Sequence, residues 1–168
     1  MKIAINAGHT LKAPGTGAVG YLVESKETRK VANHLMKLLK AKGHTVINAT
    51  IDSAKSTNDY LAKAVKISNK ADADLFISIH FNAGGGAGCE VYTWRGNKYP
   101  EAVQTCENMA VLGFKNRGIK DGSKFYVIKK TYAKALLIEV CFVDSVKDVN
   151  KYNSVGFAKV AEAIAKGI

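Results

Sequence analysis

Apolar and polar residues alternate in blocks along this 168-residue chain, and the blocks change between strand-like and helix-like spacing. Short apolar runs predict strands over 2–6, 44–50, 74–81, 88–94, 125–129 and 135–143. Helical periodicity predicts helices over 24–42, 57–71, 99–114 and 154–166. This order predicts an α/β fold: a single three-layer domain with a mostly parallel, twisted sheet of about six strands flanked by helices.

The charge balance is strongly basic. Lys and Arg total 25 against 14 acidic residues, a formal net charge of +11. Such an excess favours a polyanionic partner, either nucleic acid or an anionic wall or membrane surface. A solvated, lysine-rich surface without a partner is the alternative, because most of the excess lies on the outer faces of helices.

Membrane and disulfide classes are disfavoured. No apolar run is long enough to form a transmembrane segment, and the start lacks the pattern of a signal peptide. We therefore expect a chain made in the cytoplasm without a signal peptide, or one trimmed to a catalytic core. Cys89, Cys106 and Cys141 are odd in number and widely spaced, so neither a disulfide framework nor a cysteine zinc site is expected.

Chemically active residues follow the ends of the predicted strands. His9 follows the first strand, His80 and Asn82 end the run 74–81, and Glu139 lies within 135–143. Ligands of open α/β sheets bind beyond the carboxyl ends of the strands. Parallel strands would bring these side chains to one edge, where Glu24 begins the first long helix.

The residue types suggest metal chemistry but leave a structural role open. Two histidines and a carboxylate are a common ligand set for catalytic zinc, and a second carboxylate can act as general base. Most single histidines are instead surface or hydrogen-bonded residues, and Glu24 could simply favour a helix N-terminus. His80 and Glu139 interrupt apolar runs, however, where a polar group is costly without a partner.

Four segments resemble the zinc-dependent N-acetylmuramoyl-L-alanine amidases of the amidase-3 type. They are INAGHT (5–10), YLVESKETRKVANHLMKLLKAKGHTV (21–46), DLFISIHFNA (74–83) and ALLIEVCFVDSVKD (135–148). They occur in order over essentially the whole chain. The compact, lysine-rich form is similar to the catalytic domains of endolysins from bacteriophages of clostridia-like hosts.

The resemblance implies an activity and a set of roles. The family hydrolyses the amide between N-acetylmuramic acid and L-alanine in peptidoglycan. By position, His9, Glu24 and His80 would bind one Zn²⁺ per chain, and Glu139 would activate water. Asn82 would orient a ligand or substrate or support its loop. Asn6 stands where many members carry Asp, and would accept a hydrogen bond from an imidazole.

Further expectations accompany this interpretation. We expect one zinc amidase domain over 1–168, with a cell-wall-binding domain possible beyond 168, and a monomer that binds peptidoglycan and anionic wall polymers but no nucleic acid. The enzyme would act on the cell wall, after release by a holin if it is phage-encoded. The alternatives are a bacterial autolysin, a sporulation or germination amidase, and a non-catalytic peptidoglycan-binding module. A basic nucleic-acid binder is the least favoured alternative, because it gives His80 and Glu139 no role.

Overall fold

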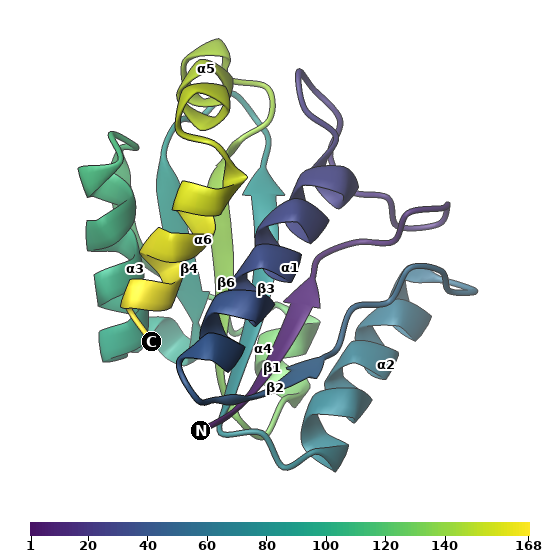
Figure 1. Cartoon of the computed structure of the whole chain (residues 1–168). Helices are drawn as coiled ribbons and strands as arrows, with labels where there is room; N and C mark the ends of the chain where they lie inside the picture. The colour runs from purple at the N-terminus through teal and green to yellow at the C-terminus, as the bar shows by residue number, and fades with distance from the viewer.

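One six-stranded sheet lies between two layers of helices in the computed structural model, which describes residues 1–168 (Figure 1). The strand order is β2-β1-β3-β6-β4-β5. All neighbouring strands pair in parallel except β6 and β4, which are antiparallel. The predicted fold class is thus confirmed. The strands are β1 (Lys2–Ala7), β2 (Thr45–Asn48), β3 (Leu75–Asn82), β4 (Cys89–Thr93), β5 (Asn116–Asp121) and β6 (Lys134–Phe142).

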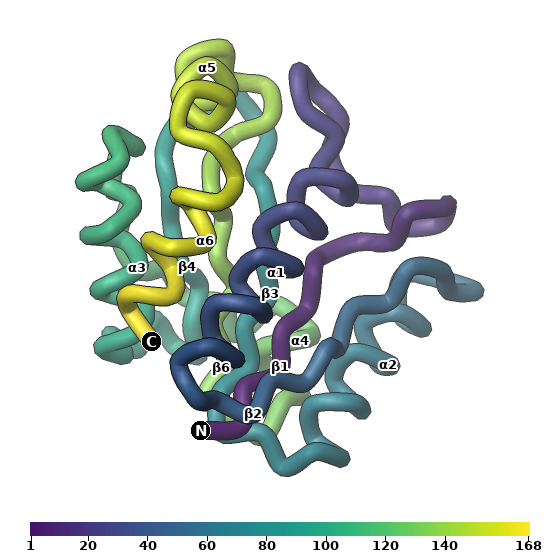
Figure 2. Tube along the Cα trace, viewed as in Figure 1, coloured from purple at the N-terminus to yellow at the C-terminus, as the bar shows by residue number.

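Six α-helices cover the two faces of this sheet. Figures 1 and 2 show α1, α3 and α6 on one face, and α2 and α4 on the other. None of the helices combines the length and the apolar character that crossing a bilayer requires. The helices are α1 (Glu24–Ala41), α2 (Thr57–Lys70), α3 (Pro100–Val111), α4 (Tyr126–Lys130), α5 (Val146–Val155) and α6 (Phe157–Lys166), and a short 3₁₀ turn spans Trp94–Gly96.

Each layer has its own apolar core. Leu35 of α1, Met109 of α3 and Ile164 of α6 belong to the larger cluster and are fully buried. On the opposite face, Phe76 of β3 and Val127 of α4 belong to a smaller cluster. Burying one such side chain stabilises the fold by about 1.5–3 kcal/mol, so the sheet is fixed from both sides and provides a rigid base for its carboxyl edge.

Two sequence predictions were wrong near the end of the chain. The segment 125–129 forms the helix α4 rather than a strand. Its residues Val127 and Ile128 pack in the smaller apolar cluster, against one face of the sheet. The strand that completes the six-stranded sheet is instead β5, a polar edge strand with no fully buried residue. The predicted helix 154–166 corresponds to α6, whereas α5 before it was not predicted; Gly156, with its φ of 83°, separates the two helices.

The parallel order of β1, β3 and β6 determines where the site can form. The three strands are adjacent and parallel, and their carboxyl ends finish at one edge of the sheet. Figure 2 shows the connection from β1 to α1 running past this edge. The expectation that His9, His80 and Glu139 approach one another therefore holds at the level of topology.

Candidate active site

Three side chains converge at the carboxyl edge of the sheet. The Oε1 atom of Glu24 lies 3.2 Å from Nε2 of His9 and 3.1 Å from Nδ1 of His80. One donor atom from each of the three residues lies within 4.8 Å of the other two. His9 comes from the loop after β1, Glu24 from the start of α1 and His80 from β3, so three separate elements build the cluster.

Two glycines make room for the imidazoles. A Cβ on Gly8 would lie 2.3 Å from the His80 ring, and a Cβ on Gly17 would lie 2.6 Å from Oε2 of Glu24. Gly17 also has a φ of 79°, in the left-handed region that favours glycine. His9 has a φ of 66°, which is uncommon for a residue with a side chain. The loop geometry is therefore specific to this cluster.

Glu24 is held as a carboxylate. Its Oε2 accepts a hydrogen bond from the Ala18 amide at 2.8 Å, and its Oε1 accepts one from the Phe81 amide at 3.0 Å. Burial works to raise the pKa of this carboxyl, but the hydrogen bonds with His80 and His9 outweigh burial and hold the pKa well below its usual value. Glu24 is thus negatively charged at any working pH.

A chain of hydrogen bonds orients His80 from behind. Its Nε2 lies 3.0 Å from the Ser78 hydroxyl, which lies 2.9 Å from the Asn6 amide. The amide satisfies most partners with its oxygen toward Ser78, because its nitrogen then lies 3.2 and 3.3 Å from the Ala7 and Ala49 carbonyls. In the tautomer that would bind a metal, Nε2–H donates to Ser78, Ser78 donates to Asn6, and Nδ1 of His80 offers its lone pair to the cation. Without a metal, Nδ1–H donates to Glu24 instead. Asn6 therefore acts on the imidazole through Ser78 and not directly.

His9 is oriented in the same manner. Its Nδ1 lies 3.1 Å from the Gly15 carbonyl and donates to it, which leaves Nε2 free to face Glu24. Burial lowers the pKa of the His80 imidazole, and Glu24 opposes part of that shift. A histidine must be neutral and hold its other N–H on a protein acceptor to serve as a metal ligand. His80 meets both conditions, and His9 meets the second.

Glu139 differs from Glu24 in its hydrogen bonds and in the direction of its pKa shift. It lies on β6 directly opposite His80 of β3, so the two side chains share one face of the sheet. Its Oε2 is buried and has no hydrogen-bond partner. Burial raises the pKa of this carboxyl to about 8, and the negative charges of Glu24 and Glu90 add to the shift.

Asn82, which was expected to orient a ligand or substrate or to support its loop, is hydrogen-bonded to the wall of the cavity. Its amide nitrogen donates to Glu90 of β4 at 2.9 Å, and its oxygen accepts from the Ala83 amide at 2.8 Å. Glu90 is itself held by Arg117, whose Nε lies 2.7 Å away. Asn82 thus supports the wall between Glu90 and the following loop, while still lining the cavity.

A cavity of about 410 Å³ joins these groups. His9, Glu24, His80 and Glu139 all line it. Its opposite wall is apolar and aromatic, formed by Tyr60, Leu61, Phe125, Tyr126, Val127 and Leu137. A concave apolar site with a few convergent polar groups is the usual form of a substrate pocket.

The donor set fits a tetrahedral metal ion. At zinc–ligand bond lengths of about 2.0–2.1 Å, neighbouring donors of a tetrahedron lie about 3.3 Å apart. The separations of 3.2 and 3.1 Å from Glu24 to the two histidines are close to that value, and the donor atoms of the two histidines lie within 4.8 Å of each other. Two neutral imidazoles and one carboxylate leave one coordination position available, as catalytic zinc sites do.

Ser78 and Glu90 were not among the site residues predicted from the sequence. Ser78 stands two residues before His80, and residues two apart in a strand share one face. A hydroxyl in an otherwise apolar run was therefore a usable signal. Glu90 could not be found in this way, because its opposition to Glu139 depends on the antiparallel pairing of β4 and β6.

An α/β domain that gathers two histidines, a bound carboxylate and a separate protonatable carboxyl has the parts of a metal-dependent hydrolase. The comparison with known families agrees with this class. The chain belongs to the N-acetylmuramoyl-L-alanine amidase family, whose pattern matches residues 3–168. Members of this family are enzymes, and they are generally zinc-dependent.

The relatives include both an uncharacterized protein and a named amidase. An uncharacterized protein of Clostridium perfringens is 36% identical over 176 residues, which cover all of this chain and 51% of the relative. The N-acetylmuramoyl-L-alanine amidase CwlM of Bacillus licheniformis is 34% identical over 174 residues, covering 99% of this chain and 65% of CwlM. The chain thus spans about half to two thirds of the length of these relatives.

A solved structure shows the same architecture. The catalytic domain of the CD27L endolysin, which targets Clostridium difficile, superposes with a TM-score of 0.91 at 28% identity. The match covers 99% of this chain and 96% of that domain. The strand order and the flanking helices described above are therefore those of an amidase catalytic domain.

Proposed function

We propose that this chain hydrolyses the amide between the lactyl group of N-acetylmuramic acid and L-alanine in peptidoglycan. His9, Glu24 and His80 hold a single zinc ion, and Glu139 acts as general base. The convergence of three donor atoms within 4.8 Å, beside a cavity that Glu139 also lines, is the observation that carries the proposal. When bound, zinc supplies a Lewis acid that polarises the amide carbonyl and lowers the pKa of water.

The protein's own groups divide the remaining work. Glu24 keeps a fixed negative charge through its hydrogen bonds and balances the cation. Glu139 takes the proton from the attacking water on its carboxylate, which lines the cavity and makes no hydrogen bond within the protein. It then delivers that proton to the departing alanine nitrogen, since an amine is a poor leaving group until it is protonated.

Substrate orientation falls to the aromatic wall of the cavity. Tyr60, Phe125 and Tyr126 face the polar cluster across a space of about 410 Å³. Rings in this position exclude water and present flat apolar surfaces to the sugar or to the stem peptide. Asn82 keeps the neighbouring wall in place through Glu90.

The formal charge of +11 supports binding to an anionic wall. We propose that the enzyme acts on the cell wall and remains near its anionic polymers through this charge. An endolysin and a bacterial amidase are both among its relatives. Lysis of a host wall is the favoured role, and an autolysin or sporulation amidase would use the same chemistry.

Digestion of purified peptidoglycan with analysis of the new ends tests the reaction. We expect new N-terminal alanine without new reducing sugars. Glu139→Gln should retain one zinc per chain and release no alanine ends, and His80→Ala should bind no zinc. Glu107→Gln on the exposed side of α3 is the matched control, and should behave as the unmodified chain. Bound zinc without new alanine ends from the unmodified chain would favour a binding module, and normal turnover by Glu139→Gln would refute the base assignment.

A further inference from the structure

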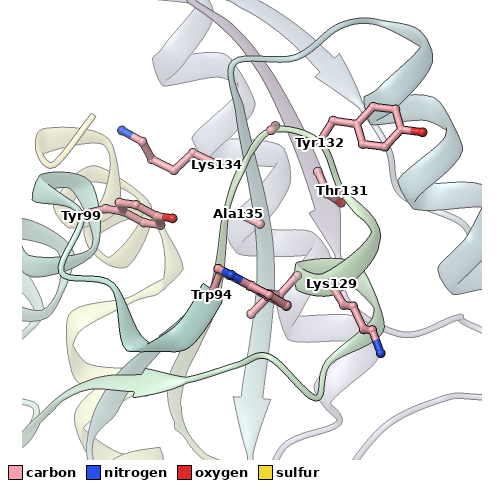
Figure 3. Close-up of a pocket in the computed structure, with 9 residues that line it drawn as sticks. Trp94, Tyr99, Lys129, Thr131, Tyr132, Lys134 and Ala135 are labelled. Carbon is pink, nitrogen blue, oxygen red and sulfur yellow. The ribbon is translucent and has the colours of Figure 1, made fainter.

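A second cavity lies at the opposite end of β6. It has a volume of about 430 Å³ and is separate from the candidate active site. Trp94 and Tyr99 lie on one side of it, and the segment from Thr131 to Ala135 on the other (Figure 3). Tyr132 points away from the hollow in this view.

The two cavities open on the same face of the sheet, on either side of α4. Tyr126 and Val127 of α4 line the candidate active site, whereas Ile128 and Lys129 line the second cavity. Along β6, residues four apart share a face and are separated by about 13 Å. Ala135 of the second cavity is thus about that far from Glu139, which is close enough for one polymer strand to reach both.

One buried hydroxyl in this cavity has no partner. Thr131 is 9% exposed, and its Oγ1 makes no hydrogen bond within the protein. A buried hydroxyl without a hydrogen bond costs about 1–3 kcal/mol. Thr131 is one of the residues that line the hollow, so an occupant toward which its side chain rotates can supply that bond.

The remaining lining suits a sugar. Trp94 and Tyr99 are only partly buried and present ring surface to the cavity. Flat aromatic surfaces pack well against the apolar faces of a pyranose, and a hydroxyl such as that of Thr131 meets its polar rim. The lining is thus mixed in character, with rings for stacking and one free donor and acceptor.

The rim of the cavity is positively charged. Lys129 is exposed and pairs with no carboxylate. Lys134 bonds Glu101 at 2.8 Å and lies 5.3 Å from the centre of the Tyr99 ring, while the Arg95 guanidinium lies 5.6 Å from that of Trp94. Glu101 therefore offsets one of these cations and leaves a net positive rim, which favours an occupant with a negative charge.

We propose that the cavity between Trp94, Tyr99 and Thr131 is a second binding site for a sugar unit of an anionic glycan. The rings stack on the sugar, Thr131 hydrogen-bonds it, and Lys129 contacts a carboxylate or phosphate on the same polymer. The choice of a wall polymer rests on the proposed function. The negative group has two sources: the lactyl carboxylate that amide hydrolysis leaves on muramic acid, or the phosphodiester of a teichoic-type polymer.

Trp94 is the only tryptophan of the chain, so its fluorescence reports on this cavity directly. The titration uses the full chain carrying Glu139→Gln, with three probes: peptide-free glycan strands, purified wall teichoic acid and uncharged chitin oligomers. We expect a saturable change with an anionic probe, and the probe that produces it identifies the source of the charge. No saturable change with either anionic probe, or equally tight binding of chitin oligomers, would overturn the proposal.

Two substitutions test the residues. Thr131→Val keeps the shape and removes a hydroxyl that has no protein partner, so the fold should be at least as stable while binding weakens about 3- to 10-fold. Lys129→Ala should weaken binding and its salt dependence, whereas Lys40→Ala, an equal charge loss on α1, should change neither. Unchanged affinity in Thr131→Val would overturn the proposal.

A separate measurement distinguishes this site from the active site. Hydrolysis of a short soluble muramyl peptide should proceed at the unmodified rate when Thr131→Val is made in the active chain. If the proposed function is wrong, the unmodified chain will not hydrolyse the peptide, while the anionic probe will still bind at the second cavity and change the fluorescence of Trp94.

Discussion

The partly buried carboxyl of Glu139 predicts how the stability of the protein depends on pH. Its ordinary pKa of 4.5 is raised to about 8 in the folded protein, chiefly by burial. Between those values the folded protein holds a proton that the unfolded chain has lost. A group that binds more protons in the folded state loses stabilising effect as pH rises. The metal-free protein should therefore become less stable from pH 5 to pH 8 because of this residue.

The size of the effect follows from the same shift. Each pH unit within the interval costs about 1.4 kcal/mol of unfolding free energy. Across the interval from 4.5 to about 8 the loss is at most about 5 kcal/mol. Because the carboxyl borders a cavity that admits water, we expect about 2–4 kcal/mol.

The perturbation is Glu139→Gln, which keeps the shape and removes the proton equilibrium. Urea unfolding of both proteins at pH 5 and pH 8, with a chelator present, gives the two free energies of unfolding. The advantage of the variant over the unmodified chain should grow by about 2–4 kcal/mol across this range. Glu107→Gln, at the surface of α3, controls for the loss of one negative charge.

Zinc provides an internal check on the cause. A cation at His9 and Glu24 would favour the charged form of the neighbouring Glu139, so the pH dependence of the unmodified chain should flatten when zinc is added. Parallel pH profiles for the unmodified chain and Glu139→Gln, without metal, would refute the reasoning. They would mean that Glu139 is ionised in the folded protein and finds a partner there.

Other predictions concern the support of the site and the core. Ser78→Ala should weaken zinc binding about 10-fold by releasing His80, as measured by competition with a chromophoric chelator. Gly17→Ala should lower both stability and zinc affinity, because its Cβ would lie 2.6 Å from Oε2 of Glu24; Gly84→Ala, with a φ of 117° and open space around it, should lower stability alone. Leu35→Ala should cost about 2–5 kcal/mol of unfolding free energy, as measured by urea denaturation, with zinc affinity unchanged.

The parts of the fold that the sequence predicted are those whose signals are local. The helix from Glu24 and the buried run at 75–82 carry their own periodicity and composition. The segment 125–129 failed because apolar, β-branched residues suit either a strand or a short helix, and the choice depended on what the sheet left uncovered. β5 is polar and gains its place only by pairing with β4.

The site could be predicted as far as the order of parallel strands reached. That order brings the end of β1 and the end of β3 together, and hence His9 and His80. Predicting that Glu90 lies opposite Glu139 would have required knowing that β4 and β6 pair antiparallel, and no local sequence pattern indicates this pairing. The second cavity, lined by Trp94, could not be predicted either, because segments far apart along the chain form its walls.

The two carboxyls of the candidate site explain how one cavity can hold both a metal ligand and a proton carrier. Glu24 is buried but faces two backbone amides and two imidazoles, so its charge is satisfied and its pKa falls. Glu139 is partly buried near the charge of Glu24, and its buried Oε2 has no hydrogen-bond partner, so its pKa rises. Environments that separate the pKa values of two neighbouring acids assign them different chemical tasks. Since hydrogen bonds from Ala18 and Phe81 fix the charge on Glu24, and that charge helps Glu139 keep its proton, the loop before α1 and the end of β3 set the protonation state of a residue on β6.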